Sequence, residues 1–245
     1  MDQNGGSDRL GAVAEYFAAI TRSEVSSVKH RSEGYLIVES GLTVVTKQQG
    51  KSLFNTGFYR QNRLHLYPEE ATCLAHRGVL DIRLASTEVS SAPGSAYLSL
   101  RDLNDRLNVH VPRECREVYC FLKDRKFIPR RVQRSGTSTH RPVLSTATNV
   151  SIAYAVHAPG KKSDPPLFNA VVFRMSDPLP PLDALLQLTQ TRQDCELLTA
   201  NTSSSCDHGG SPSPIPIKLF ACDGEGGVIA LEMLMPQLPS LPDLS

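Results

Sequence analysis

The fold is decided by residues 66–80, which read LYPEEATCLAHRGVL. Pro68 predicts the start of a helix, because a proline at the first helical position loses no hydrogen bond. The two glutamates that follow it complement the positive end of the helix dipole. Gly78 predicts the end of the helix, since glycine readily adopts the left-handed conformation found after many helices. The alternating residues 79–82 then predict a short strand.

Four short strands are predicted before this helix, separated by Gly41, Gly50 and the Gln61-Asn62 pair. Turn residues at such intervals are typical of a sheet built from neighbouring strands. The expected strands are Tyr35–Val38, Leu42–Thr46, Ser52–Tyr59 and Arg63–Leu66. We interpret them as an antiparallel meander that leads into the helix.

Two more helices and a strand are predicted after it. Ser99 with Asp102 three residues later forms a capping-box pattern at the start of one helix. Pro112 opens the next helix, and residues 127–132 are typical of a wing strand. Helix, strand, helix, helix and wing, in that order, indicate a winged helix-turn-helix between Leu64 and Arg134, with the third helix in the recognition position.

Basic residues gather at the end of this module. Residues 1–141 carry 21 Lys and Arg against 15 Asp and Glu, whereas the remainder is acidic. A basic surface suits a polyanion such as RNA, although exposed helix ends and wings are often basic for solubility alone. Arg113, Arg116 and Lys123 are expected to lie off the buried stripe of the third helix. The candidate RNA-binding residues are Lys123, Arg125, Lys126, Arg130, Arg131 and Arg134.

The second half predicts a small mixed α/β domain. Residues 135–150 are interpreted as a linker, because they are rich in Ser, Thr and other loop formers. Strands are expected at 152–157, 168–175, 195–199, 217–222 and 227–234, with a helix at 182–188 and a hairpin turn at 223–226. The full division is a variable or partly helical N-terminus at 1–33, a domain at 34–134, the linker at 135–150, a domain at 151–235 with a loop insertion at 201–214, and a tail at 236–245. The predicted fold class is therefore α+β.

The cysteines and the apolar runs indicate the redox compartment of the protein and whether it binds metal or a membrane. None of the six cysteines forms a CxxC pair, and no histidine stands at zinc-finger spacing from a cysteine pair. Cys73, Cys115 and Cys222 lie among apolar neighbours, as buried free thiols do. No apolar run approaches the length that spans a membrane, and no secretory signal core begins the chain. We expect a reducing compartment, no metal, no cofactor and no membrane contact.

Residues 66–80 resemble the LxPEEAxYLxERGxL segment of the tRNA-splicing endonuclease structural subunit of the Sen fifty-four type. Residues 117–131, EVYCFLKDRKFIPRR, resemble the second signature of that family, and residues 57–66 and 98–100 are similar to the segments that lead into the two signatures. Three positions depart from the family pattern, namely Cys73, Lys126 and Pro129. The chain is also short for this subunit, and the usual insertion between its halves is almost absent.

The resemblance implies a non-catalytic subunit that helps to position pre-tRNA. It also implies a C-terminal half similar to the nuclease fold of archaeal tRNA-intron endonucleases, whose last strands pair with a catalytic subunit edge to edge. The candidate interface residues are Ile217, Leu219, Val228, Ile229 and Leu231. The implied partners are pre-tRNA and the catalytic and structural subunits of a heterotetramer. The implied location is the nucleus, with the cytoplasm or the mitochondrial surface as alternatives in some lineages.

The catalytic members of that superfamily supply Tyr, His and Lys. Residues 164–167 hold no His at the place expected for it, and residues 133–137 hold no Tyr. Lys218 is near the place of the Lys, but a lone Lys is more often solvated. Tyr154 and His157, three apart on a predicted strand, are expected on opposite faces. We assign no catalytic residue, leaving as alternatives a catalytic endoribonuclease subunit of the same complex or a winged-helix DNA-binding or transcription-complex protein.

Overall fold

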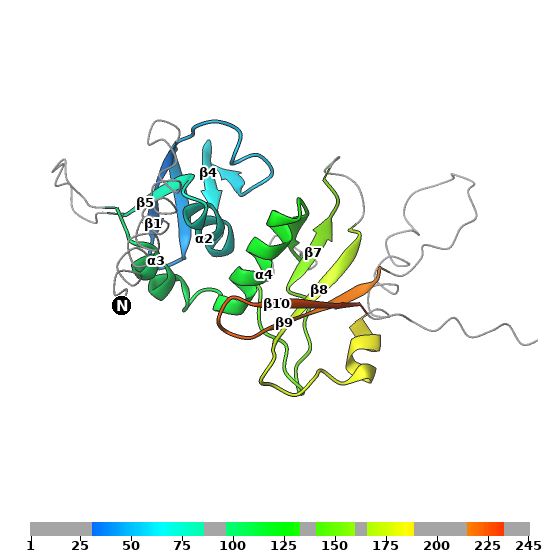
Figure 1. The fold of residues 1–245 in the computed structure, drawn as a ribbon. Helices are drawn as coiled ribbons and strands as arrows, with labels where there is room; N and C mark the ends of the chain where they lie inside the picture. The colour runs from blue at the N-terminus through cyan, green and yellow to red at the C-terminus, as the bar shows by residue number, and fades with distance from the viewer. Residues whose placement is uncertain (1–30, 86–96, 133–140, 160–165, 189–214, 233–245) are drawn as a thin grey trace, which may run out of the picture. The chain divides into compact units, whose positions relative to one another are not determined.

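The computed structural model describes residues 31–85, 97–132, 141–159, 166–188 and 215–232 (Figure 1). Contacts divide the chain into two units, Met1–His110 and Val111–Ser245. Each unit contains a five-stranded sheet of mixed direction. Helices accompany both sheets, so the predicted α+β class is confirmed.

The sheet of the first unit has the strand order β3-β4-β2-β1-β5. Its pairs are antiparallel except for β1 and β5, which run parallel. The expected meander is therefore wrong in its order, because β4 and not β3 lies beside β2. The strands are β1 (Ser32–Ile37), β2 (Leu42–Lys47), β3 (Phe58–Arg60), β4 (Arg63–Leu66) and β5 (Leu80–Leu84).

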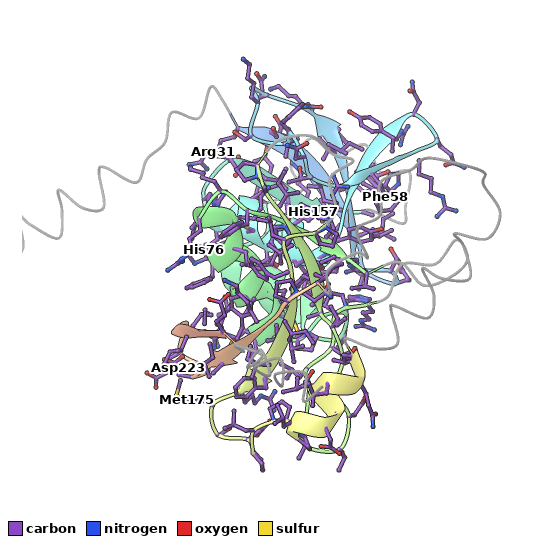
Figure 2. The ribbon with its side chains drawn as sticks, turned by 90° about the vertical axis from the view of Figure 1, so that its right-hand side faces the viewer. Arg31, Phe58, His76, His157, Met175 and Asp223 are labelled. Carbon is purple, nitrogen blue, oxygen red and sulfur yellow. The ribbon has the colours of Figure 1, made fainter. Side chains whose placement is uncertain are left out.

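A turn replaces the first part of the strand predicted at residues 52–59. The Thr56 hydroxyl donates to the Leu53 carbonyl at 2.6 Å, and Asn55 and Gly57 have φ angles of 60° and 67°. A Cβ at Gly57 would stand 2.3 Å from the carbonyl oxygen of His65, so only glycine fits there. Strand β3 consequently begins at Phe58 (Figure 2) and is only three residues long.

Helix α2 (Pro68–His76) has the predicted limits. At its start, the Glu70 carboxylate accepts hydrogen bonds from the backbone N–H groups of Tyr67 at 2.9 Å and Gly57 at 2.7 Å. Glu70 is only 7% exposed, so backbone N–H groups, and not water alone, stabilise its carboxylate. At the other end Gly78, with φ of 65°, follows the helix as predicted.

Helices α2 and α3 (Leu100–Leu107) contribute to the core of the first unit. The Ser99 hydroxyl accepts from the Asp102 backbone N–H at 3.1 Å, which confirms the predicted cap. Leu103 and Leu107 are almost fully buried, as their helical spacing predicts. They pack with sheet and α2 residues, among them Leu36, Leu64, Leu66, Leu74, Leu80 and Ile82.

The sheet of the second unit has the order β10-β9-β8-β7-β6. Helix α4 (Arg113–Asp124) lies against it, and residues 182–188 are helical as predicted. Leu185 from that helical stretch joins Val171, Phe173, Ile217, Leu219 and Ala221 in a second core. The strands are β6 (Ile128–Arg131), β7 (Tyr154–His157), β8 (Phe168–Arg174), β9 (Ile217–Cys222) and β10 (Val228–Glu232).

The boundary between the units differs from the predicted linker. Residues 141–150 belong to the second unit, where the Ser145 N–H donates to the Val172 carbonyl at 2.7 Å and the Ser145 side chain is fully buried. Helix α3 falls in the first unit, whereas α4 and the predicted wing strand β6 fall in the second. The β6 backbone pairs with β7, the next strand along the chain. The winged-helix arrangement of these helices stays a prediction.

The hairpin of β9 and β10 closes through the predicted turn at residues 223–226. Asp223, labelled in Figure 2, accepts at Oδ1 from the backbone N–H groups of Glu225 at 2.7 Å and Gly227 at 2.9 Å. These backbone hydrogen bonds lower the pKa of the Asp223 carboxyl. The strand expected at residues 195–199, the insertion at 201–214 and the tail at 236–245 lie outside the described residues, as do residues 1–30.

Replacing Glu70 with Gln tests the double hydrogen bond at the start of α2. The variant keeps one acceptor oxygen but turns an NH2 group toward the second N–H donor, so we expect a loss of about 1–2 kcal/mol in the free energy of unfolding. Urea denaturation of the full chain measures this loss. Glu39→Gln, an exposed carboxylate in the same unit, is the matched control and should change stability little. Equal stability of the two variants would contradict the role of Glu70.

Candidate nucleic-acid interface and subunit edge

Helix α4 ends in a tight corner that exposes two of the predicted RNA-binding residues. The N–H of Lys126 donates to the Lys123 carbonyl, and the N–H of Phe127 donates to the Leu122 carbonyl, both at 3.1 Å. This pair of hydrogen bonds is the Schellman motif, which needs a residue with a left-handed backbone conformation after the helix. Lys126 occupies that position with φ of 69°. Arg125 and Lys126 are both exposed at this corner.

The Arg125 side chain is held against its own helix. Its guanidinium carbon lies 3.4 Å from the centroid of the Phe121 ring, and Nη1 donates to the Phe121 carbonyl at 3.3 Å. Stacking of this kind fixes the cation while leaving its outer edge available to a phosphate. The corner therefore presents one fixed cation at Arg125 beside one on the flexible stem of Lys126.

The two arginines of β6 point to opposite faces of the second sheet. Arg130 lies opposite Ala155 and Arg131 lies opposite Tyr154, and successive residues of a strand alternate in direction. Both already interact with other groups, as does Lys123. The structure thus brings Lys123, Arg125 and Lys126 together at the corner and separates Arg130 from Arg131. Arg134 lies outside the described residues.

Arg116 corrects the prediction for the outer side of α4. Arg113 is exposed there as expected and pairs with Glu117 at 2.6 Å, but Arg116 is only 1% exposed. Burial lowers the pKa of Arg116, and the neighbouring Glu117 carboxylate partly opposes this shift. The prediction failed because α4 is buried over a wider arc than one apolar stripe, an arc that also takes in Glu114.

The first turn of α4 is anchored to three strands. The Tyr154 hydroxyl donates to the Cys115 carbonyl at 3.0 Å, and the Cys222 thiol donates to the Glu114 carbonyl at 3.8 Å. The Glu114 carboxylate forms an ion pair with Arg174. Burial raises the pKa of Cys222 to about 12, so this thiol stays protonated at neutral pH. Sequence reasoning missed these anchors, because they join residues far apart in the chain.

The side chains considered for catalysis are used in packing or pairing. Tyr154 is fully buried, and its hydroxyl is engaged as described above. Lys218 forms an ion pair with Glu232 at 3.2 Å, and its Nζ lies 4.9 Å from the centroid of the Phe168 ring. His157 ends β7 (Figure 2), three residues after Tyr154 and therefore on the other face of the strand. The strand geometry does not bring these three groups to one point.

The described part of the chain contains no cluster of side chains typical of a metal centre. No group of three His, Cys, Asp or Glu residues there could hold a metal ion. Cys73, Cys115 and Cys222 are buried free thiols, which confirms their expected state. No helix among the described residues has both the length and the apolar character needed to cross a membrane.

Among the strands that the structure describes, β10 is at an edge of the second sheet, and it carries exposed apolar side chains. Ile229 is 51% exposed and Leu231 is 44% exposed, whereas Val228 is half-buried. Two other predicted interface residues, Ile217 and Leu219, are buried within the core that contains Leu185. They support the hairpin from within this core, and a role for them at a subunit interface stays a prediction.

Comparison with known proteins finds one family match, and it lies within the first unit. Residues 17–84 match the family model described as tRNA-splicing endonuclease subunit sen54 N-term. The match includes β1 to β5 and α2, and it confirms the resemblance seen in residues 66–80. No curated protein matches the chain.

Lys126→Gly tests the backbone corner independently of charge. A left-handed backbone costs a residue with a side chain about 1–2 kcal/mol, and glycine avoids this cost. Glycine loses more conformational entropy on folding than lysine does, which offsets part of the benefit. We therefore expect a net gain of roughly 0.5–1 kcal/mol in the free energy of unfolding. Lys126→Ala removes the same charge but keeps the unfavourable φ, so it should give no gain. Urea denaturation compares the two variants. A glycine variant no more stable than the alanine variant would rule out strain at this corner.

Proposed function

We propose that this protein is a non-catalytic subunit of the tRNA-splicing endonuclease complex, because residues 17–84 match the sen54 N-terminal family of subunits of that complex. In this proposal it helps to position pre-tRNA for intron excision and holds a catalytic subunit. The family match carries the proposal. The arrangement of the second unit supports a role in which this chain binds and a partner subunit cleaves.

Metal-free cleavage by attack of a 2′-hydroxyl on the adjacent phosphate needs a base, an acid and a cation at one point. Tyr154 could serve only if its hydroxyl left a buried hydrogen bond to the Cys115 carbonyl. Lys218 would have to leave its ion pair with Glu232. Each of these changes costs free energy, and His157 faces the opposite side of the sheet. These contacts support a structural role for Tyr154 and Lys218.

Positioning of RNA requires contacts with its phosphates, which fix orientation without reading sequence. Arg125 and Lys126 are exposed cations on neighbouring residues, and the α4 corner holds their backbone in place. We propose this corner as the phosphate contact of the second unit. Arg130, Arg131 and Lys123 would add charge around it.

The β10 edge is the proposed docking site for a catalytic subunit. An edge strand offers unpaired backbone N–H and C=O groups that another strand can bind. Ile229 and Leu231 continue the apolar face formed by Ala221 and Leu219, because they lie opposite these residues in the hairpin. A partner strand with apolar side chains would cover both. The full assembly we propose is a heterotetramer with pre-tRNA as its substrate, located in the nucleus.

Single substitutions at the three candidate catalytic positions separate a structural subunit from a catalytic one. In a reconstituted complex, we expect Tyr154→Phe, His157→Ala and Lys218→Ala to leave the rate of pre-tRNA cleavage within about twofold of the parent. Tyr154→Phe should lower the free energy of unfolding by about 1 kcal/mol, because a buried hydrogen bond is lost. Single-turnover cleavage assays measure the rate. A loss of a hundredfold or more, of the order that general acid-base groups contribute, with assembly intact would make this chain a catalytic subunit.

Charged side chains on the β10 edge test the docking proposal. The double variant Ile229→Lys, Leu231→Lys should abolish co-purification of a catalytic subunit, since unpaired charges would be buried in the interface. The matched control is Leu179→Lys, Leu182→Lys, which places the same charges on exposed leucines of the same unit. Size-exclusion chromatography of the co-expressed subunits provides the measurement. Equal retention of the partner by both double variants would move the interface elsewhere.

A further inference from the structure

The first unit contains a cavity between the end of β2 and the β3-β4 hairpin. Strands β2 and β4 pair only at Thr43 with Leu66 and at Val44 with His65, and beyond that point they separate. The resulting cavity has a volume of about 460 Å³, within the range of about 300–1,000 Å³ found for small-molecule sites. Its lining residues are Val45, Thr46, Gln48, Tyr59, Asn62, Arg63 and Leu64.

The lining combines an aromatic ring, carboxamides and an apolar floor. Val45 and Leu64 are buried and form the floor. Tyr59 is 70% exposed, so its ring is available to a flat ligand. Gln48 and Asn62 are exposed, and each carboxamide can both donate and accept hydrogen bonds. A nucleobase needs these three features, namely a stacking surface, an apolar contact and hydrogen-bonding groups at its edge.

The hairpin adds positive charge beside the cavity. Arg60 and Arg63 flank the turn at Gln61 and Asn62, and the two arginines lie directly opposite each other across the strands. Like charges in that position destabilise a hairpin. Within the described part of the chain neither arginine pairs with an acid, and the Arg63 contact is with the Tyr35 hydroxyl at 3.3 Å. A bound phosphate would remove the repulsion.

We propose that this cavity binds an unpaired nucleotide of RNA. Its base stacks on Tyr59, its edge meets Gln48 and Asn62, and its phosphate is neutralised by Arg63, the arginine that lines the cavity. The inference rests on the proposed function, because it assumes that the complex handles RNA. An acidic peptide would use the arginines but gain little from an exposed tyrosine beside two carboxamides. A paired duplex would not fit, since its base faces are hidden by stacking.

The test is RNA binding by the full chain, measured by fluorescence anisotropy. The probe is a labelled single-stranded RNA of about 12 nucleotides, free or annealed to its complement. We expect Tyr59→Ala to weaken single-strand binding about tenfold, the effect of losing one stacked base, and Tyr59→Phe to bind as the parent does. Phe54→Ala is the matched control, because Phe54 is 72% exposed in the same unit but does not line the cavity.

Three results would overturn the nucleotide site. These are unchanged binding by Tyr59→Ala, an equal loss in Phe54→Ala, or displacement of the RNA by polyglutamate as effectively as by unlabelled RNA. The last result would assign the surface to polyanions in general. Capture of endonuclease subunits by the tagged chain tests the proposed function separately. If the subunits are captured while Tyr59→Ala binds RNA normally, only the nucleotide site fails.

Discussion

The Glu70 carboxylate holds the first unit together at its most irregular point. It accepts backbone hydrogen bonds from Tyr67, at the start of α2, and from Gly57, at the end of the turn before β3. Without this carboxylate, two partly buried N–H donors would lose their acceptor, which costs stability. Gly57 is equally constrained, since any Cβ there would collide with the His65 carbonyl. Together the two residues determine where the β3-β4 hairpin leaves the sheet, and the cavity beside β2 depends on that departure.

The second unit is organised around the attachment of α4. Tyr154, Cys222 and Arg174 each bind the first turn of the helix, and they come from three different strands of one sheet. The same attachment favours a structural role for Tyr154 over a catalytic one, because its hydroxyl and its ring are both buried. The surfaces that we propose for function are the exposed corner after α4 and the apolar edge at β10. Both surfaces are suited to holding other molecules in place.

Local structure could be predicted from the sequence, and long-range pairing could not. Pro68 and Gly78 set the limits of α2 because proline and glycine act on their own backbone, and Asp223 marks the hairpin turn for the same reason. The place of β4 beside β2 follows from pairing and from the constraint at Gly57, which no local pattern shows. Among the candidate site residues, some features could likewise be predicted from local sequence and others could not. The exposure of Arg125 and Lys126 was predictable from the end of a helix, whereas the opposite directions of Arg130 and Arg131 required the strand limits of β6.

The most direct measurement of the central claim is the set of proteins that accompany the chain in its cell. The full chain would be tagged at its native level, purified after ribonuclease treatment and analysed by quantitative mass spectrometry. We predict that the catalytic and structural subunits of tRNA-splicing endonuclease are recovered in amounts close to that of the chain itself. Recovery of transcription factors with no endonuclease subunit would contradict it.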